Sequence, residues 1–392
     1  MSEDHYLSHI YQRFPIDIDR GKGAKVWDIS NKEYVDCMGG YGVAIVGHCN
    51  ERVVRAIKEQ ADKLIVCHMS LFNEMRLNFL KKLFSLTPPG IERVFFSNSG
   101  AEAVEAALKF SRKFSGKNGI IAMKGAYHGK TFGALSVTYN DKYRSSFKPL
   151  LEGVKFVPYG QASKLEEAID DKIGAVILEP IQGETGIIVP PDDFIEKVRE
   201  ICNRHHLVLI FDEIQSGLGR TGKMWAGQNW DTVPDVMCIA KGIAGGVPMG
   251  LTLTKSEIIE CIKMGEHSST FSGNPLACAA GLATLESLTE DKLVEKAGKI
   301  GTIFKEKLLR LQEKHRIIRE VRGLGMMLGV EMRFDVRDLL LDAINEGLLM
   351  LYSGRNVIRL LPPLVMDEAT VAKAVNIIDK VISAEEKRRN VH

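Results

Sequence analysis

The sequence predicts an α/β fold whose large domain has a mainly parallel sheet between helices. One observation is a set of short, unbroken apolar runs rich in β-branched residues. Strands of this kind are buried on both faces, as in a parallel sheet covered by helices. A second observation is that stretches with helical periodicity separate many of these runs, which is typical of a doubly wound sheet.

The predicted elements of this domain follow in chain order. Strands are predicted at residues 93–97, 119–123, 154–158, 175–179, 207–212, 236–240 and 251–254. The helices predicted between them cover residues 101–114, 162–170 and 194–205. A sheet of this kind would place the carboxyl ends of its parallel strands along one edge, where such folds bind ligands.

The two ends of the chain depart from this pattern. A charged amphipathic helix over 288–315 precedes a strand-like stretch at 322–332, and then a helix near 336–346, two short strands and a helix near 367–387. This order predicts a smaller α+β C-terminal domain. The N-terminal residues contain short strands and no core of their own, so we expect them to pack on the small domain or on a partner subunit. The predicted N-terminal segment, large domain and small domain cover residues 1–48, 49–284 and 285–392.

Composition excludes several classes of protein. The chain has 392 residues, of which 45% are hydrophobic and 26% charged, as in ordinary globular proteins. The 52 Lys and Arg residues nearly balance the 50 Asp and Glu residues, so nothing indicates a nucleic-acid partner. The sequence has no apolar run of the roughly 20 residues that span a bilayer and no N-terminal signal, so we expect a cytoplasmic protein without membrane contact. Its seven cysteines form no CxxC pair, and we expect neither a disulfide scaffold nor a metal site.

The first segment that carries chemistry is Ser97–Glu102, between a strand and a helix. Backbone amides at a helix N-terminus, with Ser99 and Gly100 beside them, could bind a phosphate. Ser99 followed by Glu102 is also a capping box, which needs no ligand. The two interpretations are compatible.

Two further residues end buried strands. Asp212 follows an apolar strand, where it could pair with a protonated ring nitrogen, bind a metal or cap a turn. Lys241 ends another apolar strand, and desolvation there would lower the pKa of its amine and make it a nucleophile. The simpler interpretation of Lys241 is an ammonium group that reaches solvent from a strand end.

A phosphate-binding ATPase is a rival interpretation, because an apolar strand followed by Asp-Glu also resembles a magnesium-binding strand. The stretch 217–224 nearly matches the phosphate loop, but Met224 stands where a hydroxyl should bind Mg²⁺. The stretch 125–131 has one residue too few between its glycines. Both fail a requirement of the loop, so the sequence argues against an ATPase.

A lysine nucleophile, an acid at a neighbouring strand end and a phosphate-binding helix terminus together suggest pyridoxal phosphate. Lys241 would hold the cofactor's aldehyde covalently, and Asp212 would keep its ring nitrogen protonated. Ser99, Gly100 and Ala101 would hold the phosphate. An aromatic residue should stack on the ring, and Tyr127, just after a strand, is the candidate.

With these motifs the sequence resembles class III (ω-type) pyridoxal-phosphate aminotransferases of fold type I, in the group of acetylornithine, ornithine and 4-aminobutyrate aminotransferases. The resemblance extends from about Val26 to Val381. The matching stretches are MGGYGVAIVGH, FFSNSGAEAVEAALK, GAYHGKTFGALS, ILEPIQGETGIIVPP, LIFDEIQSGLGRTGKMWA, CIAKGIAGGVPMG, STFSGNPLACAAG and VIRLLPPL. Together they are specific to this family, whereas any one alone is weak.

The resemblance implies roles for the cofactor residues. Lys241 matches the lysine that binds the cofactor and moves the proton, and Asp212 matches the acid at the pyridine nitrogen. Gln215 matches the glutamine at the cofactor's phenolic oxygen, and Tyr127 matches the stacking aromatic residue.

It also implies a shared site. Gly100 and Ala101 match the phosphate loop, while Ser269 and Thr270 match a segment that crosses a dimer interface, where the threonine binds the partner's phosphate. The implied assembly is therefore a homodimer or a tetramer of such dimers.

The implied substrate residues follow the same pattern. Arg359 matches the arginine that binds the carboxylate of glutamate and 2-oxoglutarate, and Glu184 matches the residue that pairs with it when the ω-amino substrate is bound. Tyr41 and Phe72 match pocket positions. Lys130 departs from the family, which has an arginine there for the α-carboxylate of the ω-amino substrate; a lysine supplies a point charge and no bidentate fork.

This departure favours a narrower branch, in which lysine or ornithine is linked through its α-amino group to a small acidic amino-group carrier protein. The sequence therefore favours transfer of the terminal amino group between carrier-linked lysine or ornithine and 2-oxoglutarate or glutamate, in lysine or arginine biosynthesis. The alternative is an acetylornithine or acetyl-lysine aminotransferase. A 4-aminobutyrate or other ω-amino transaminase is third.

Overall fold

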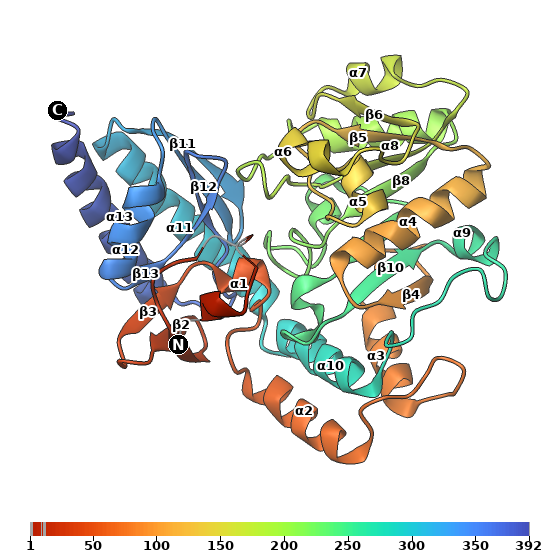
Figure 1. The fold of residues 1–392 in the computed structure, drawn as a ribbon, viewed down its shortest axis with the longest axis horizontal. Coiled ribbons are helices and arrows are strands. Elements are labelled where there is room, and N and C mark those ends of the chain that lie inside the picture. Colours follow the sequence, from red (N-terminus) through yellow and green to blue (C-terminus); the bar gives the residue numbers. More distant parts are fainter. Residues whose placement is uncertain (1–2, 9, 11–12, 392) are drawn as a thin grey trace.

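The computed structural model describes residues 3–8, 10 and 13–391 (Figure 1). Its large domain contains a seven-stranded sheet in the order β4-β10-β9-β8-β7-β5-β6. Strands β5 to β9 pair in parallel, whereas β10 is antiparallel to both β4 and β9. The predicted mainly parallel sheet is confirmed, and each strand lies within two residues of its prediction. The strands are β4 (Arg93–Ser97), β5 (Gly119–Met123), β6 (Val154–Val157), β7 (Ile173–Leu178), β8 (Val208–Asp212), β9 (Val236–Ile239) and β10 (Gly250–Thr254).

Helices cover both faces of this sheet. Successive side chains of a strand point to opposite faces, so Ile210 of β8 packs in the same buried cluster as Val104 of α4 (Gly100–Ser115). Its neighbour Phe211 packs in a second cluster with Val198 of α8 (Phe194–Arg204). Burial on both faces explains why these strands are unbroken apolar runs in the sequence.

The small domain contains the antiparallel sheet β11-β12-β15-β14. The stretch 322–332, expected as one strand, is a hairpin, because Gly323 and Gly325 allow the chain to turn back with positive φ. The helix expected from residue 288 begins later, because α10 continues to Glu290 and Lys292 has a φ of 51°. The elements are α11 (Leu293–Lys314), β11 (Ile318–Leu324), β12 (Met327–Met332), α12 (Arg337–Asn345), β13 (Leu348–Leu349), β14 (Leu351–Ser353), β15 (Val357–Leu360) and α13 (Glu368–Arg388).

The N-terminal strands lie against the small domain, where Figure 1 shows them in red beside the blue C-terminal elements. They form one sheet with β13, in which Leu348 pairs with Val35. Tyr34 is buried in the same cluster as Ile344 and Leu349. The segment therefore completes a core that it shares with the small domain. Its strands are β1 (Ile18–Lys22), β2 (Lys25–Asp28) and β3 (Glu33–Asp36).

The remaining helices surround the sheet. Three of the longer ones have no counterpart in the sequence prediction: α2 (Glu51–Lys63), α3 (Glu74–Phe84) and α10 (Pro275–Glu290). The predicted helix over 162–170 is shorter, because α7 ends at Glu167. The short helices are η1 (Glu3–His5), α1 (Gly39–Gly42), α5 (Phe132–Val137), α6 (Asp141–Arg144), η2 (Ser145–Phe147), α7 (Ala162–Glu167), η3 (Ala226–Trp230), η4 (Lys241–Ala244) and α9 (Ser256–Glu260).

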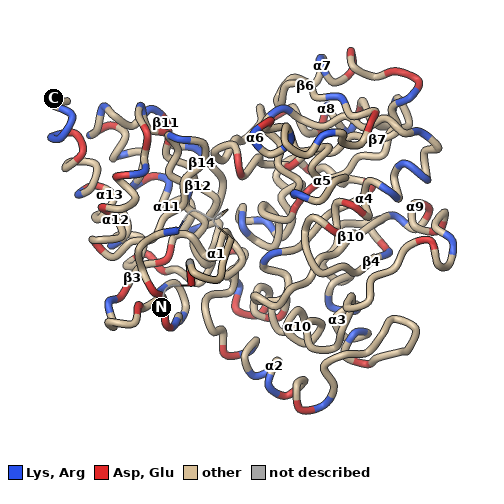
Figure 2. Tube along the Cα trace, in the orientation of Figure 1, with Lys and Arg blue, Asp and Glu red and all other residues tan. Residues whose placement is uncertain are grey.

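Acidic and basic residues are interspersed along the chain in both domains, as Figure 2 shows. Over the part of the chain that the structure describes, no helix is long and apolar enough to cross a membrane. The same residues contain no cluster of three or more metal-ligating side chains. All seven cysteines are free.

Candidate active site

The site lies where three neighbouring strands end. Glu179 follows β7, Asp212 ends β8 and Lys241 follows β9, and these strands are adjacent in the sheet. Asp212 and Glu179 are buried. Glu184 and Arg359 also lie near enough to Lys241 to influence its ionisation. The structure thus brings Lys241 and Asp212 together at the predicted edge, with two acids and an arginine beside them.

The surroundings of Lys241 lower the pKa of its amine. Burial lowers its pKa, the Asp212 carboxylate opposes that shift and Arg359 adds to it. A lower pKa increases the fraction of neutral amine, which is the nucleophilic form. The backbone of Lys241 has a φ of 48°, a left-handed conformation that costs a non-glycine residue roughly 1–3 kcal/mol. The packing around the lysine therefore holds it in a strained and defined position.

Asp212 is held by a residue that the sequence analysis did not single out. Oδ2 of Asp212 lies 2.7 Å from Nδ1 of His128, and Oδ1 accepts a hydrogen bond from the backbone N–H of Ile214 at 3.1 Å. His128 is buried, and its Nε2 has no partner among the described residues. The sequence signal was its place beside Tyr127 in the GAYHGKT stretch. The pair orients the carboxylate that would face a ring nitrogen.

Glu179 is a second residue that sequence reasoning missed. Its carboxylate accepts the backbone N–H groups of Tyr127 at 3.0 Å and Gly183 at 2.9 Å. Burial is the main cause that raises the pKa of Glu179 to about 7; His128 opposes the shift and the Asp212 carboxylate adds to it. Its position directly after a buried strand, like that of Asp212, was the available signal. Glu179 fixes the loop of the predicted stacking residue to the loop that carries Glu184.

The N-terminus of α4 contains the predicted phosphate site. Ser99 is the N-cap: its Oγ accepts the N–H of Glu102 at 3.3 Å, while the Glu102 carboxylate accepts the N–H of Asn98 at 2.7 Å. The N-cap half of the predicted capping box is therefore present, whereas the Glu102 carboxylate binds the N–H of Asn98 and not that of Ser99. The N–H groups of Gly100 and Ala101 donate to no residue that the structure describes, so they remain available to an anion.

Gln215 lies against the loop at residue 183. Its buried Oε1 has no hydrogen-bond partner within the described ranges. A Cβ at Gly183 would lie 2.0 Å from that oxygen, so only glycine permits this approach. The amide is therefore positioned by close packing and keeps hydrogen-bonding capacity for a ligand.

Arg359 and Glu184 form an ion pair in the site. Nη1 of Arg359 lies 2.9 Å from Oε2 of Glu184 and donates to the carbonyl of Gly183 at 3.2 Å. Arg359 is fully buried, and its Nε and Nη2 have no partner in the described chain. The Tyr41 ring centroid is 5.6 Å from the guanidinium carbon. The guanidinium is thus bound to Glu184 and Gly183 through Nη1 alone, and its other donors stay unpaired among the described residues.

The small domain holds the loop that carries Glu184. Arg322 of β11 donates through Nε to the carbonyl of Gly186 at 2.9 Å, and Ser353 of β14 donates to the carbonyl of Glu184. Arg359 of β15 adds its contacts to the same loop. The position of the small domain therefore determines the position of Glu184.

Lys130 is exposed at the edge of the site. Its Nζ lies 4.7 Å from the ring centroid of Tyr143, which is a cation–π contact. The Tyr143 hydroxyl donates to Oε1 of Glu184 at 3.4 Å. Sequence reasoning missed Tyr143, since no local motif marks it.

Of three further predicted residues, only Ser269 has a described contact at the site of the same chain. Ser269 lies beside the phosphate site, where its Oγ accepts from Nδ2 of Asn98 at 3.0 Å. Thr270 is exposed, and Phe72 is fully exposed on the loop between α2 and α3. None of the described contacts joins Phe72 to the other predicted site residues, so its predicted place in this chain's pocket is not observed.

The stretch 217–224 packs against the small domain. A Cβ at Gly222 would lie 2.8 Å from the Cα of Gly298 in α11, so the two backbones touch. Arg220 is fully buried and donates to the carbonyls of Met326 and Pro362. The stretch 217–224 therefore belongs to the contact between the large and small domains.

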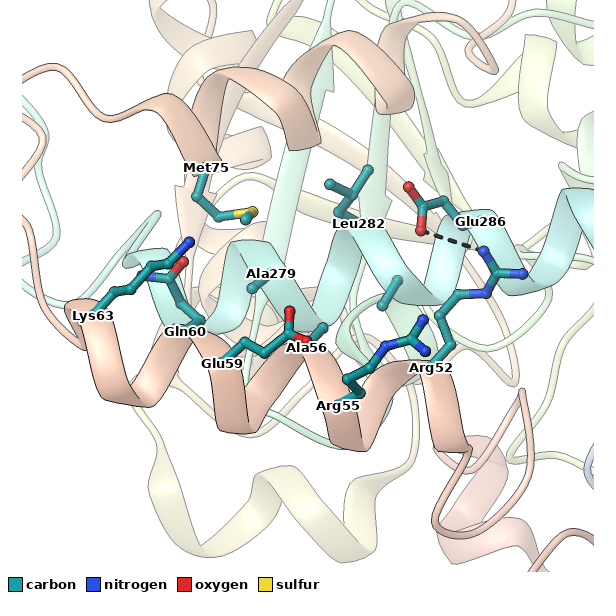
Figure 3. Close-up of a pocket in the computed structure, with 11 residues that line it drawn as sticks. Arg52, Arg55, Ala56, Glu59, Gln60, Lys63, Met75, Ala279, Leu282 and Glu286 are labelled. Atoms are coloured by element: carbon teal, nitrogen blue, oxygen red, sulfur yellow. Dashed lines mark ion pairs between the residues drawn. The ribbon is translucent and has the colours of Figure 1, made fainter.

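A cavity of about 180 Å³ lies between α2, α3 and α10, apart from the candidate active site (Figure 3). Arg52 and Glu286 face each other across it, 3.6 Å apart. None of the predicted site residues lines this cavity.

The fold and the site define an enzyme that transfers amino groups with pyridoxal phosphate. The unpartnered amides at α4, the Gln215 amide and the lysine between an acid and an arginine fit the cofactor's phosphate, phenolic oxygen and aldehyde. The chain belongs to the aminotransferase class-III family, whose model matches residues 6–382. Members of this family use pyridoxal phosphate.

Individual relatives are similar over nearly the whole chain. An acetylornithine aminotransferase from Methanopyrus kandleri is 44% identical over 375 residues, which are 95% of this chain and 95% of the relative. The structure of the ornithine aminotransferase from Toxoplasma gondii, described with pyridoxal phosphate at its active site, has a TM-score of 0.96 at 33% identity and covers 99% of this chain and 94% of its own. An acetylornithine aminotransferase from Elizabethkingia anophelis has a TM-score of 0.87 at 34% identity, with 97% of each chain covered.

Proposed function

We propose that this aminotransferase moves the terminal amino group of N-acetylornithine to 2-oxoglutarate, or the reverse. The observation that carries the proposal is the Glu184–Arg359 ion pair, 2.9 Å long, beside Lys241. Such a pair suits two different substrates: an amine with no carboxylate on its reacting carbon, and an oxo acid that has one. The similarity to acetylornithine aminotransferases supports N-acetylornithine over the carrier-linked substrate that the sequence analysis favoured.

Different residues of the chain bind the cofactor and transfer the proton. The bound cofactor supplies an aldehyde that accepts the amino group and a ring that accepts electrons. Lys241 carries a proton on Nζ to and from the reacting carbon, and its lowered pKa suits both directions. Asp212, oriented by His128, supplies the negative charge that keeps the ring nitrogen protonated. Gly100 and Ala101 hold the phosphate through backbone amides.

Arg359 and Glu184 let one pocket accept both substrates. During the amine half-reaction the Glu184 carboxylate neutralises Arg359, so no unpaired buried cation repels the substrate. During the oxo-acid half-reaction Glu184 moves away, and Arg359 binds the carboxylate through two parallel N–H donors. Buried as it is, Arg359 offers those donors in one fixed orientation.

Lys130 supplies the charge for the anionic end of the amine. Its exposed ammonium lies at the edge of the site, where it could attract either an α-carboxylate or an acidic carrier protein. Carrier-linked lysine or ornithine is therefore the second candidate substrate, and this observation favours it.

We also propose a homodimer. Arg76 is buried and donates to the carbonyls of Cys67, Leu71 and Gly273, so the loop before α3 and the loop before α10 lie side by side. These loops and their surroundings expose large apolar side chains that a second subunit would cover: Leu64, Ile65, Val66, Met69, Leu71, Phe72, Met264 and Phe271. Thr270 and Phe72 would then face the partner's site. Sedimentation of the purified enzyme should give the mass of a dimer or tetramer, and a monomer at micromolar concentration would contradict the proposal.

The substrate proposal is tested by one comparison. Cofactor-loaded enzyme is assayed with 2-oxoglutarate and, in turn, N-acetylornithine, ornithine, N-acetyl-lysine, 4-aminobutyrate and carrier-linked lysine. We expect the highest kcat/KM with N-acetylornithine. A higher value with carrier-linked lysine would favour the second candidate, and a higher value with 4-aminobutyrate would overturn both.

A further inference from the structure

Tyr143 of α6 contacts three side chains of the site. Its hydroxyl donates to Oε1 of Glu184 at 3.4 Å. Its ring meets the ring of Tyr127 edge to face, with centroids 5.8 Å apart, and the Lys130 ammonium lies 4.7 Å from the same ring. No other residue described above touches both the predicted stacking residue and the partner of Arg359.

The Glu184 carboxylate therefore has two donors on different oxygens. Arg359 of the small domain donates to Oε2, and Tyr143 of the large domain donates to Oε1. Both bonds are made in the arrangement where Glu184 covers Arg359. Each one makes it harder for Glu184 to move away.

We propose that Tyr143 is a positioning residue that holds Glu184 on Arg359 and thereby weakens the binding of 2-oxoglutarate relative to the amine. The inference rests on the proposed function, since it concerns how one pocket accepts two substrates. The hydroxyl can act only as a donor toward the carboxylate. Burial raises the pKa of Tyr143 above its ordinary value, and the Glu184 charge adds to the shift, so the hydroxyl keeps its proton at neutral pH.

The expected effect follows from a two-state equilibrium. A dicarboxylate binds only the fraction of enzyme in which Arg359 is free, so its apparent affinity is reduced by that fraction. Loss of the Tyr143 hydroxyl increases the fraction of free Arg359. The amine binds the form in which the pair is intact, and this form still predominates after the change, so its affinity is almost unaffected.

The test is the substitution Tyr143→Phe, which keeps the ring beneath Lys130 and beside Tyr127. Glutarate, a dicarboxylate without the reactive carbonyl, is titrated into the cofactor-loaded enzyme in a calorimeter. We expect its Kd to fall about five-fold, the order expected from the net contribution of one ordinary hydrogen bond, because the bond to Glu184 is long at 3.4 Å. In steady-state assays kcat/KM for 2-oxoglutarate should rise by a similar factor, while kcat/KM for the amine changes by less than about two-fold.

Two controls make the result specific. Tyr139→Phe removes a hydroxyl four residues away, from a ring that packs on Phe156 and has no hydrogen bond to a site residue among the described ones, and should leave both constants unchanged. In a Glu184→Ala background, Tyr143→Phe should have no further effect on glutarate binding, because the carboxylate that it acts through is gone.

Unchanged or weaker glutarate binding in Tyr143→Phe would overturn the inference. So would an equal fall of kcat/KM for both substrates, which would indicate a general structural role. The glutarate titration does not depend on the amine. If the wild-type enzyme failed to use N-acetylornithine, the proposed substrate would be wrong, yet the titration would still decide the role of Tyr143.

Discussion

Nδ1 of His128 lies 2.7 Å from Oδ2 of Asp212, and both side chains are buried beside Lys241. The imidazole fixes one carboxylate oxygen, and the N–H of Ile214 binds the other. The orientation of Asp212 is therefore set before any cofactor binds. A preorganised charge of this kind needs no rearrangement when the ring arrives.

Replacing His128 should weaken cofactor binding. His128→Ala removes a hydrogen bond to a charged group, so we expect the Kd for pyridoxal phosphate to rise about ten-fold. His128→Asn is the matched control, because its amide N–H can take the place of Nδ1 and should recover much of the affinity. The measurement is an absorbance titration of apo-enzyme. Equal affinities for wild type and His128→Ala would show that the pair does not orient Asp212.

Arg359→Ala should raise the KM for one substrate, 2-oxoglutarate. Loss of a buried fork for a carboxylate should raise the KM for 2-oxoglutarate about 100-fold, by the usual cost of a charge-assisted pair. The KM for the amine should change far less, since Glu184 covers Arg359 in that half-reaction. Initial rates with each substrate varied at saturating partner give both values. Equal increases would contradict the assigned role.

Lys130→Arg should increase the affinity of the enzyme for the amine substrate. A guanidinium can bind a carboxylate through two parallel bonds, which an ammonium cannot do. We expect the KM for N-acetylornithine to fall about five-fold, and Lys130→Gln should raise it by a similar factor. The assay is the same substrate comparison. No change in either variant would place the α-carboxylate away from residue 130.

The raised pKa of Glu213 should make the free energy of unfolding depend on pH. Burial raises the pKa of its carboxyl to about 7, although the N–H groups of Ala226 and Gly227 oppose the shift. Below pH 4.5, the pKa of this carboxyl in the unfolded chain, Glu213 is protonated in both the folded and the unfolded state. As the pH rises from 4.5 to 7, the unfolded chain releases this proton before the folded protein does. The free energy of unfolding therefore falls over this range. The loss amounts to about 3 kcal/mol at 1.36 kcal/mol per pH unit.

Glu213→Gln should remove this dependence. Chemical denaturation at fixed protein concentration, from pH 4.5 to 8, should show the wild-type free energy of unfolding falling relative to that of the variant. Glu92→Gln is an exposed control and should follow the wild type. Parallel curves for wild type and Glu213→Gln would contradict the raised pKa.

The sequence predicted the sheet well because its strands are buried on both faces. It missed α10, where residues such as Ala277, Ala280 and Ala283 are buried on a helix with little polar contrast around its circumference. It merged the start of α11 with the end of α10, because the break rests on the backbone conformation of Lys292 alone.

The site was predictable in part. Lys241 and Asp212 stand at strand ends, so local pattern and elementary chemistry place them together. Gln215, Glu184 and Arg359 came from family resemblance, because their approach depends on loops that no periodicity describes. Tyr143 reaches Glu184 across 41 residues of chain, and its hydroxyl bond could be found only in the folded structure.

The central claim is that the amine at residue 241 takes up pyridoxal phosphate and that the chain's transferase chemistry depends on it. The most direct measurement is the visible spectrum of purified enzyme with added pyridoxal phosphate, before and after extensive dialysis, for wild type and Lys241→Ala. We predict a retained yellow absorbance in the wild type and its loss in the variant, together with loss of amino transfer. A colourless wild type that does not retain the added cofactor would contradict the account.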